Sequence, residues 1–282
     1  MEKEHNFKIL SGFILKILAL IFMTIDHIGF FMQKYENLRE ITEIFRILGR
    51  FSFPLIIFLL VEGIKHTKDI KKYFTRLSLL AFAFFIGQMI NYIFISKNST
   101  MLSPAIDLLL TGSCIYLLSR KDKYSYLASL PIVWAIISMI ARNYEFHHLV
   151  KFKWFPFFLR PDYYLYGPLL GIGFYYSTDL ARLFLNSKEE TKTLIGTSFE
   201  RTTSNLISGV FVFVITIALT FIDRYLLRSL YTSPWQIYAV FSLIPILLYS
   251  GLRGSNAKWF QYGCYFYFPM HLVIIFTIFA LL

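Results

Sequence analysis

The stretch that decides the fold runs from Ile21 to His66. It begins Ile21-Phe-Met-Thr-Ile-Asp26-His27-Ile-Gly29 and ends Arg46-Ile-Leu-Gly49-Arg50-Phe-Ser-Phe-Pro54-Leu-Ile-Ile-Phe-Leu-Leu-Val-Glu62-Gly63-Ile-Lys-His66. Ionisable side chains here lie inside two long apolar segments. Removing such a group from water is costly, so within a membrane helix it is expected to face other helices and to serve a function. We therefore interpret both segments as spans of a helical membrane bundle.

The composition of the whole chain supports this interpretation. Of the 282 residues, 56% are hydrophobic and 16% are charged, and the mean hydropathy is +0.57. Such a chain has lipid as its main solvent. The net charge of +11 comes from Lys and Arg in short tracts between apolar segments, where they set orientation in the membrane. This distribution argues against nucleic-acid binding.

The expected fold is an all-α, polytopic bundle with about nine to ten transmembrane helices, in a single domain covering residues 1–282. A span needs about twenty apolar residues. Nine stretches meet that length approximately: Leu10–Met32, Ile41–Ile64, Tyr73–Ile95, Leu102–Leu118, Tyr124–Ile140, Pro161–Phe184, Leu206–Asp223, Leu230–Ser250 and Trp259–Leu281.

The connections between these stretches carry two further predictions. The polar linker Asn186–Asn205 is expected to be a surface loop, and the mixed aromatic and basic segment Arg142–Arg160 is expected to lie in the membrane interface. The basic cluster from Lys65 to Arg76 places that connection, and with it the N-terminus, on the cytoplasmic side.

Asp26 and His27 are adjacent, so on a helix their side chains point about 100° apart. Each then needs its own partner from another helix. An imidazole near its ordinary pKa can take a proton from an attacking amine or hydroxyl, and a carboxylate can orient the imidazolium that forms. The alternative is that both residues mark the water interface at the outer end of the helix.

Arg46 and Arg50 are four residues apart and share one helical face, which is costly unless an anion lies nearby. Two guanidinium groups suit a phosphate or carboxylate. The alternative is that they extend to the interface as snorkelling residues. Pro54, just beyond them, is expected to kink the helix at this place.

Glu62 and His66 are also four residues apart and are candidates for an acid/base or orienting pair. The alternative is a helix end that enters cytosolic water. His271 lies deep in the last apolar stretch, where Tyr hydroxyls one or two turns earlier are candidate partners, unless it is a hydrogen-bonded core histidine.

Four other polar residues have simpler expected roles. Asp107 could pair with a buried Arg or His, although a helix N-terminal carboxylate near the interface is the plainer interpretation. Asp162 is expected to cap the sixth span. His147 and His148 are adjacent, which is poor spacing for chelation, and are expected to be solvated.

The chain lacks the sequence motifs of several classes of enzyme and metal site. Walker, GxGxxG, GxSxG and HExxH patterns are absent, and Cys114 and Cys264 form no CxxC or Cys/His ligand spacing. No metal, zinc site or disulfide is expected.

The blocks described above resemble the TraX family, which is named for a conjugative-plasmid protein associated with N-terminal acetylation of pilin. The resemblance covers nearly the whole chain in order. The blocks that carry it are Thr24-Ile-Asp26-His27-Ile-Gly29, Arg46 to Pro54, Glu62-Gly63, His66-Thr67, Tyr166-Gly167, Ile244-Pro245 to Gly251, Lys258-Trp259-Phe and Tyr267-Phe-Pro269-Met-His271.

This family resembles the transmembrane acyltransferases, which implies an enzyme that uses acetyl-CoA as acyl donor. The resemblance then implies a catalytic set of Asp26, His27, Glu62 and His271, with His27 the favoured base, and a donor-binding pair of Arg46 and Arg50. The expected acceptor is an amine or hydroxyl of a pilin or peptide N-terminus, or of a glycan. The segment Ser103-Pro-Ala-Ile-Asp107 departs from the family pattern and leaves the acceptor open.

Two other function classes use the same residues. Buried acids, His and Arg build proton relays in transporters and flippases, although the chain shows no inverted repeat. A non-enzymatic membrane assembly factor would use them as polar contacts between helices. In each case the expected location is the bacterial plasma membrane, with membrane lipid as a partner. The acyltransferase would also have an acyl acceptor at or in the membrane as a partner.

Overall fold

The computed structural model describes residues 9–90, 93, 104–120, 122–150, 152, 155, 157–187, 189–227, 233–255 and 257–281. Within these ranges the regular structure is helical, and an isolated bridge pairs Leu10 with Tyr249. The prediction of an all-α fold is therefore confirmed for the part of the chain that is described.

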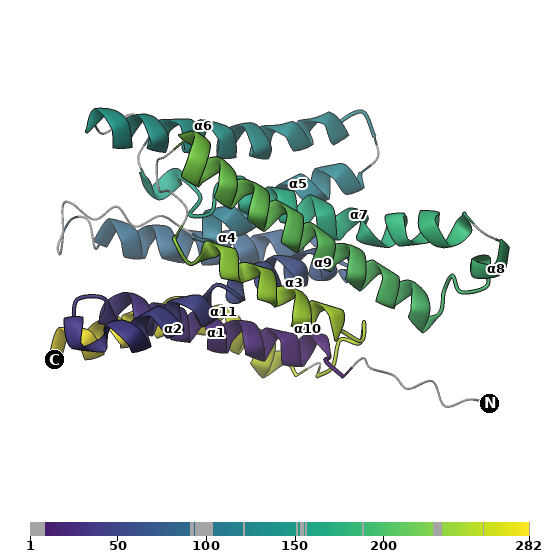
Figure 1. The fold of residues 1–282 in the computed structure, drawn as a ribbon, viewed down its shortest axis with the longest axis horizontal. Coiled ribbons are helices and arrows are strands. Elements are labelled where there is room, and N and C mark those ends of the chain that lie inside the picture. The colour runs from purple at the N-terminus through teal and green to yellow at the C-terminus, as the bar shows by residue number, and fades with distance from the viewer. Residues whose placement is uncertain are drawn as a thin grey trace. The chain divides into compact units, whose positions relative to one another are not determined.

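The helices follow one another with few long connections (Figure 1). They are α1 (Gly12–Met32), α2 (Arg39–Gly49), α3 (Ser52–His66), α4 (Ile70–Ile90), α5 (Pro104–Ser119), α6 (Ser129–His148), α7 (Tyr166–Asn186), α8 (Glu189–Lys192), α9 (Ser198–Phe221), α10 (Leu243–Leu247) and α11 (Lys258–Leu281). Short 3-10 turns are η1 (Glu36–Leu38), η3 (Ser125–Ala128), η4 (Phe157–Leu159) and η6 (Gln236–Ser242), and η5 (Ile222–Leu227) is a π-helix.

Six helical stretches among the described residues are long and apolar enough to cross a membrane, so the chain is a multi-pass membrane protein. They are Gly12–Met32, Glu36–His66, Ile70–Ile90, Ser125–His148, Ser198–Tyr225 and Trp259–Leu281. The expected count of nine to ten is not confirmed. The fourth expected span is a helix of only 16 residues, and the eighth is divided between η6 and the five-residue α10.

The chain divides into two compact units. The first consists of Met1–Leu59, Gly173–Ile217 and Trp235–Leu282, and the second of Leu60–Ile172 and Ala218–Pro234. In the first unit α1 packs against α2 and α11, and η6 contacts α2 (Figure 1). In the second unit α5 packs against both α4 and α6. The prediction of a single domain over the whole chain stays a prediction.

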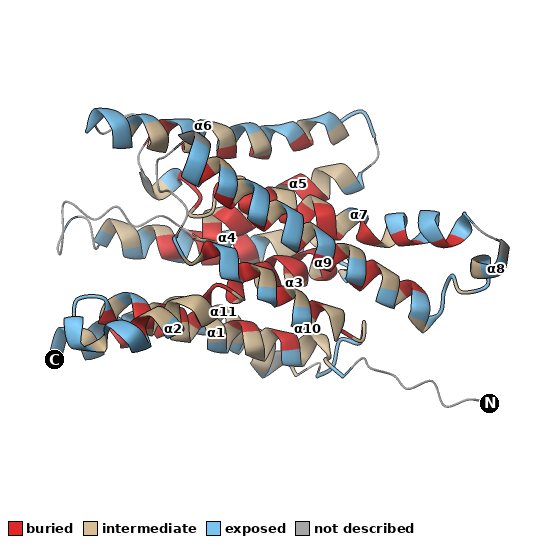
Figure 2. Ribbon diagram, in the orientation of Figure 1, coloured by how far each residue is buried: buried red, intermediate tan, exposed pale blue. Residues whose placement is uncertain are grey.

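Helix α9 has both buried and exposed positions along its length (Figure 2). Its buried positions include Ser204, Asn205 and Ser208, and its exposed positions include Leu206 and Phe213. The Ser204 hydroxyl lies 3.1 Å from that of Ser177, and the amide of Asn205 donates to the carbonyl of Tyr249 at 2.8 Å. Small polar residues between helices with apolar residues outside are typical of a protein surrounded by lipid.

The interruption expected near Arg50 and Pro54 is present, between the end of α2 and the start of α3. Helix α2 ends at Gly49, and α3 begins at Ser52, so Pro54 lies in the first turn of α3. A missing N–H has little consequence in that turn, because the first N–H groups of a helix have no partner within it. The break thus separates the arginine-bearing helix from the apolar helix that follows.

Both predicted connections contain regular structure in the parts that are described. The linker Asn186–Asn205 contains α8 and the first turns of α9, where Glu200 accepts from Arg182 at 2.7 Å and from the N–H of Gly196 at 2.6 Å. The segment Arg142–Arg160 begins as the end of α6. Its Lys151, Lys153 and Trp154 lie outside the described residues.

Side chains cap two of the helices. Ser11 accepts from the N–H of Ile14 at the start of α1, and Asp69 accepts from the N–H of Lys72 at 3.0 Å just before α4. Such caps satisfy backbone donors that have no partner in the first turn. The backbone N–H of Lys72, assisted by its ammonium group, holds the pKa of Asp69 below its ordinary value.

Candidate functional site

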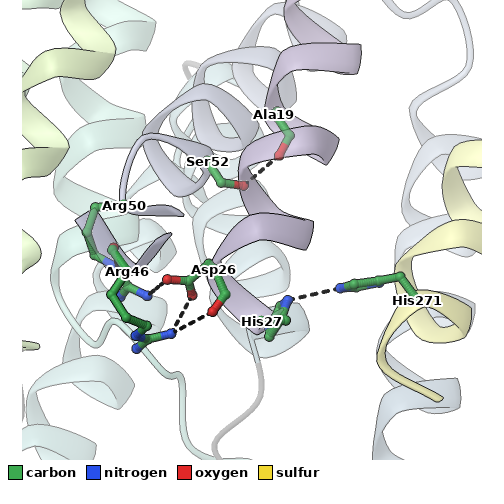
Figure 3. Close-up of polar contacts among 7 residues, drawn as sticks. All are labelled: Ala19, Asp26, His27, Arg46, Arg50, Ser52 and His271. Atoms are coloured by element: carbon green, nitrogen blue, oxygen red, sulfur yellow. Dashed lines mark hydrogen bonds and ion pairs between the residues drawn. The ribbon is translucent and has the colours of Figure 1, made fainter. Parts of the chain in front are cut away.

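The first unit brings Asp26 of α1 against two arginines from the end of α2 (Figure 3). Nη1 of Arg46 lies 2.9 Å from Oδ2 of Asp26 and also donates to the Asp26 carbonyl at 3.2 Å. Arg50 donates from Nη2 to Oδ1 of Asp26 and from Nε to the Arg46 carbonyl. We call these three residues the ion cluster. It holds one negative and two positive charges.

Two glycines allow α1 and α2 to come close enough for these contacts. A Cβ on Gly49 would overlap the side chain of Asp26, and one on Gly29 would lie 2.8 Å from Cβ of Phe45. Overpacking of this kind forces backbones apart. The Gly residues therefore set the helix separation that the ion cluster requires.

Arg46 is the less buried of the two arginines in the ion cluster. Its side chain is 11% exposed, compared with 5% for Arg50. The guanidinium carbon of Arg46 lies 5.6 Å from the ring centres of both Phe30 and Trp235, within the range of cation–π attraction. The two rings thus help to fix the orientation of Arg46.

His27, adjacent to Asp26, turns instead toward α11 (Figure 3). Its Nδ1 lies 3.0 Å from Nε2 of the buried His271, whose own Nδ1 lies 3.0 Å from the carbonyl of Tyr267. One turn earlier, the hydroxyls of Thr24 and Tyr267 lie 2.6 Å apart. We call His27 and His271 the histidine pair.

Glu62 belongs to the second unit. Its buried carboxylate lies 3.7 Å from Nε2 of His66, which is 68% exposed. The predicted proximity of these two residues is present, but Glu62 is not among the residues of the ion cluster or the histidine pair.

A family model described as TraX protein matches residues 11–279. The chain belongs to the TraX family. It is also similar to a protein named "Probable fimbrial assembly protein FimC, serogroup H1", of Dichelobacter nodosus, with 39% identity over 67 residues. That match covers 24% of this chain and 27% of the relative, so the chain spans about a quarter of the relative's length. No solved structure matches the chain.

Within this TraX-family chain, the separate partners expected for Asp26 and His27 are present, on α2 and α11. The anion that the paired arginines require is Asp26 itself. The partner of His271 on α11 is the Tyr267 carbonyl, while the Tyr267 hydroxyl contacts Thr24. The sequence pattern identifies the polar residues, but it does not identify these atoms.

Asp107 of the TraX-family chain has a role that sequence reasoning missed. Its fully buried carboxylate accepts the backbone N–H groups of Asp162, at 2.6 Å, and Tyr163, at 3.1 Å. Asp162 lies four residues before α7 begins, so it does not occupy the N-cap position expected of it. These bonds hold the connection before α7 against α5.

A second buried contact fixes the same connection. Arg160, only 2% exposed, donates to both carboxylate oxygens of Glu145 at 2.7 and 3.0 Å, and to the Phe155 carbonyl. Glu145 also accepts the N–H of Phe152 at 2.8 Å. Two features of the sequence could have predicted this contact: Glu145 is a lone Glu in an apolar helix, and Arg160 follows it fifteen residues later.

His147 and His148 at the end of α6 are exposed, as expected. Across the described ranges, no group of three or more His, Cys, Asp or Glu side chains is arranged to hold a metal ion. The candidate site is therefore built from an ion cluster and an imidazole pair.

Proposed function

We propose that this protein is an acyltransferase of the bacterial plasma membrane, which transfers an acetyl group from acetyl-CoA to an amine or hydroxyl of a surface or secreted acceptor. The observation that carries the proposal is the placement of His27. Its imidazole lies within a membrane-crossing helix, is hydrogen-bonded to a buried second imidazole, and is adjacent to a buried carboxylate with two arginines. Such an arrangement is costly in a span and is typical of a functional site.

The two parts of the site suit the two needs of acyl transfer. An imidazole can remove the proton of the attacking amine or hydroxyl, a contribution of about 10²–10⁴ in rate. Cationic groups stabilise the negative charge that develops on the thioester oxygen. The ion cluster has one more positive than negative charge, and Arg46 is the more exposed of its two arginines. We assign Arg46 to an anionic part of the donor, with Arg50 holding Asp26.

The acceptor is proposed from the relative's name. A fimbrial assembly protein is matched over about a quarter of its length, and the family is named for a protein associated with pilin acetylation. We propose a pilus-related acceptor, either a pilin or peptide N-terminus or a surface glycan. The same relative also favours a second function, a non-enzymatic pilus assembly factor in which the ion cluster and the histidine pair hold helices together.

The test is acyl transfer by protein in lipid vesicles with labelled acetyl-CoA and a cell-surface fraction of the source organism. The variant is His27→Ala, and the matched control is His147→Ala, which removes an exposed histidine at the end of α6. We expect His27→Ala to lower the rate of CoA release and label transfer by about 10² or more, and His147→Ala to leave it unchanged.

Equal rates in wild type and His27→Ala, at equal folded yield, would contradict the assignment of the base. If the protein is an assembly factor, His27→Ala changes the number of assembled pili without changing the mass of any surface component. Mass spectrometry of surface proteins and glycans from the two strains separates the two functions.

A further inference from the structure

We infer that His271 is a positioning residue that fixes the protonation of His27, so that Nε2 of His27 is the nitrogen that takes the proton. This inference rests on the acyl transfer proposed above, and it concerns how the site is oriented. It follows from the direction of the hydrogen bonds between α1 and α11 (Figure 3).

The backbone carbonyl of Tyr267 determines which nitrogen donates in each of these hydrogen bonds. Nδ1 of His271 lies 3.0 Å from the carbonyl oxygen of Tyr267. A carbonyl can only accept, so Nδ1 of His271 must carry the proton. A neutral His271 then has a bare Nε2, which can only accept.

The same reasoning continues to His27. Its Nδ1 lies 3.0 Å from the bare Nε2 of His271, so His27 must donate from Nδ1. Neutral imidazole carries one proton, and Nε2 of His27 is therefore left with a lone pair. Among the described residues, no hydrogen bond to Nε2 of His27 is present that would occupy this lone pair.

A second bond between the same two helices holds the orienting group in place. The hydroxyl of Thr24 donates to the Leu20 carbonyl at 2.8 Å, so Thr24 accepts from the Tyr267 hydroxyl at 2.6 Å. The Tyr267 ring also stacks on that of His271, with an interplanar angle of 9°. Tyr267 is thus fixed by its side chain while its carbonyl directs His271.

Asp26 does not take this orienting role in the structure. Both of its carboxylate oxygens are bound, one by Arg46 and one by Arg50. Since neighbouring side chains on a helix point about 100° apart, His27 faces α11 while Asp26 faces α2. A neutral imidazole therefore occupies the position that a carboxylate has in a Ser-His-Asp triad.

In the proposed step, Nε2 of His27 first accepts a proton and then donates it. The acceptor's O–H or N–H proton moves to Nε2 of His27 as the oxygen or nitrogen bonds to the thioester carbon. The carbon–sulfur bond then breaks, and the proton on Nε2 passes to the sulfur to give CoA thiol. The N–H at Nδ1 stays bonded to His271 throughout.

The first experiment reads the tautomer without depending on activity. Protein with ¹⁵N-labelled histidine in lipid vesicles is studied by solid-state NMR at mildly alkaline pH, and His27 is assigned by the loss of its signals in His27→Gln. We expect a protonated Nδ1 and a bare Nε2 on His27. A bare Nδ1 on His27 would overturn the inference. With the expected tautomer, an absence of acyl transfer would contradict the proposed function alone.

The second experiment compares two substitutions of His271. In His271→Gln the amide oxygen replaces Nε2 as acceptor, whereas in His271→Asn the shorter side chain cannot reach His27. We expect His271→Gln to keep kcat within about threefold, and His271→Asn to lower kcat by about 10² with KM unchanged. The NMR signals of His27 should keep the wild-type tautomer in the Gln variant alone. Equal loss in both variants with the tautomer unchanged would overturn the positioning role.

Discussion

At the scale of single residues, the ion cluster is the most demanding feature of this protein. Three ionised side chains are removed from water, and Asp26 is the shared counter-charge for Arg46 and Arg50. The free energy lost when ions are removed from water is offset only when every ion has its partner and its hydrogen bonds. The stability of the first unit should therefore depend on the balance of charge here more than on any single contact.

We expect Asp26→Asn to destabilise the protein by about 3–5 kcal/mol, the cost of leaving buried charges without their partner. Unfolding in detergent, followed by loss of the monodisperse peak on heating, gives the measurement. The control is the double variant Asp26→Asn with Arg50→Gln, which removes one positive charge along with the negative one. It should be more stable than Asp26→Asn alone, and a double variant that is less stable would contradict the charge-balance account.

At the scale of helices, the contact between α1 and α2 depends on Gly49. The side chain of Asp26 occupies the space that a Cβ at this position would need. By contrast, a Cβ on Gly87 of α4 would meet no atom within 4 Å. Substitution of Ala for Gly is therefore expected to have opposite effects on stability at these two positions.

We expect Gly49→Ala to destabilise the protein by about 1–3 kcal/mol through overpacking, and to lower acyl transfer because the ion cluster moves. Gly87→Ala should be neutral or stabilising, by up to about 1 kcal/mol, because Ala favours helix over Gly. Heat unfolding of both variants in the same detergent checks the pair. Equal stability of the two variants would show that α1 and α2 are not in close contact at Gly49.

Sequence reasoning about elements failed where an apolar stretch is divided into shorter helices. The sequence predicts one span over Leu230–Ser250, whereas the described part of this stretch is divided between η6 and α10. Hydropathy measures whether a residue prefers lipid to water, and it does not measure whether the backbone continues as one helix.

At the scale of the whole molecule, the basic cluster between Lys65 and Arg76 predicts the orientation in the membrane. The stretches Gly12–Met32 and Glu36–His66 are both able to cross it. The short connection between them should then face outward, and the connection after His66 should face the cytoplasm. This orientation places Asp26 and His27 in the outer half of α1. Under the proposed acyl transfer, an acetyl group from cytoplasmic acetyl-CoA would then have to enter the bundle to reach them.

The orientation can be measured with cysteine variants in a background in which Cys114 and Cys264 are replaced by Ala. Gln33 and Lys68 are both exposed and lie in the two connections. In intact cells we expect Gln33→Cys to react with a membrane-impermeant maleimide, and Lys68→Cys to react only after permeabilisation. Detergent-solubilised protein, in which both cysteines should react, is the control. The reverse pattern in cells would place His27 in the cytoplasmic half instead.

The sequence by itself determined the membrane environment, the all-helical class and the family, because hydropathy, charge placement and motif order are properties of the chain. It also determined that Asp26 and His27 need different partners, because adjacent residues on a helix diverge. Only the tertiary structure decided which partners they have. Arg50 lies 24 residues from Asp26, and His271 lies 244 residues from His27. Helix packing alone brings such groups together, and the direction of each bond depends on which atoms then meet.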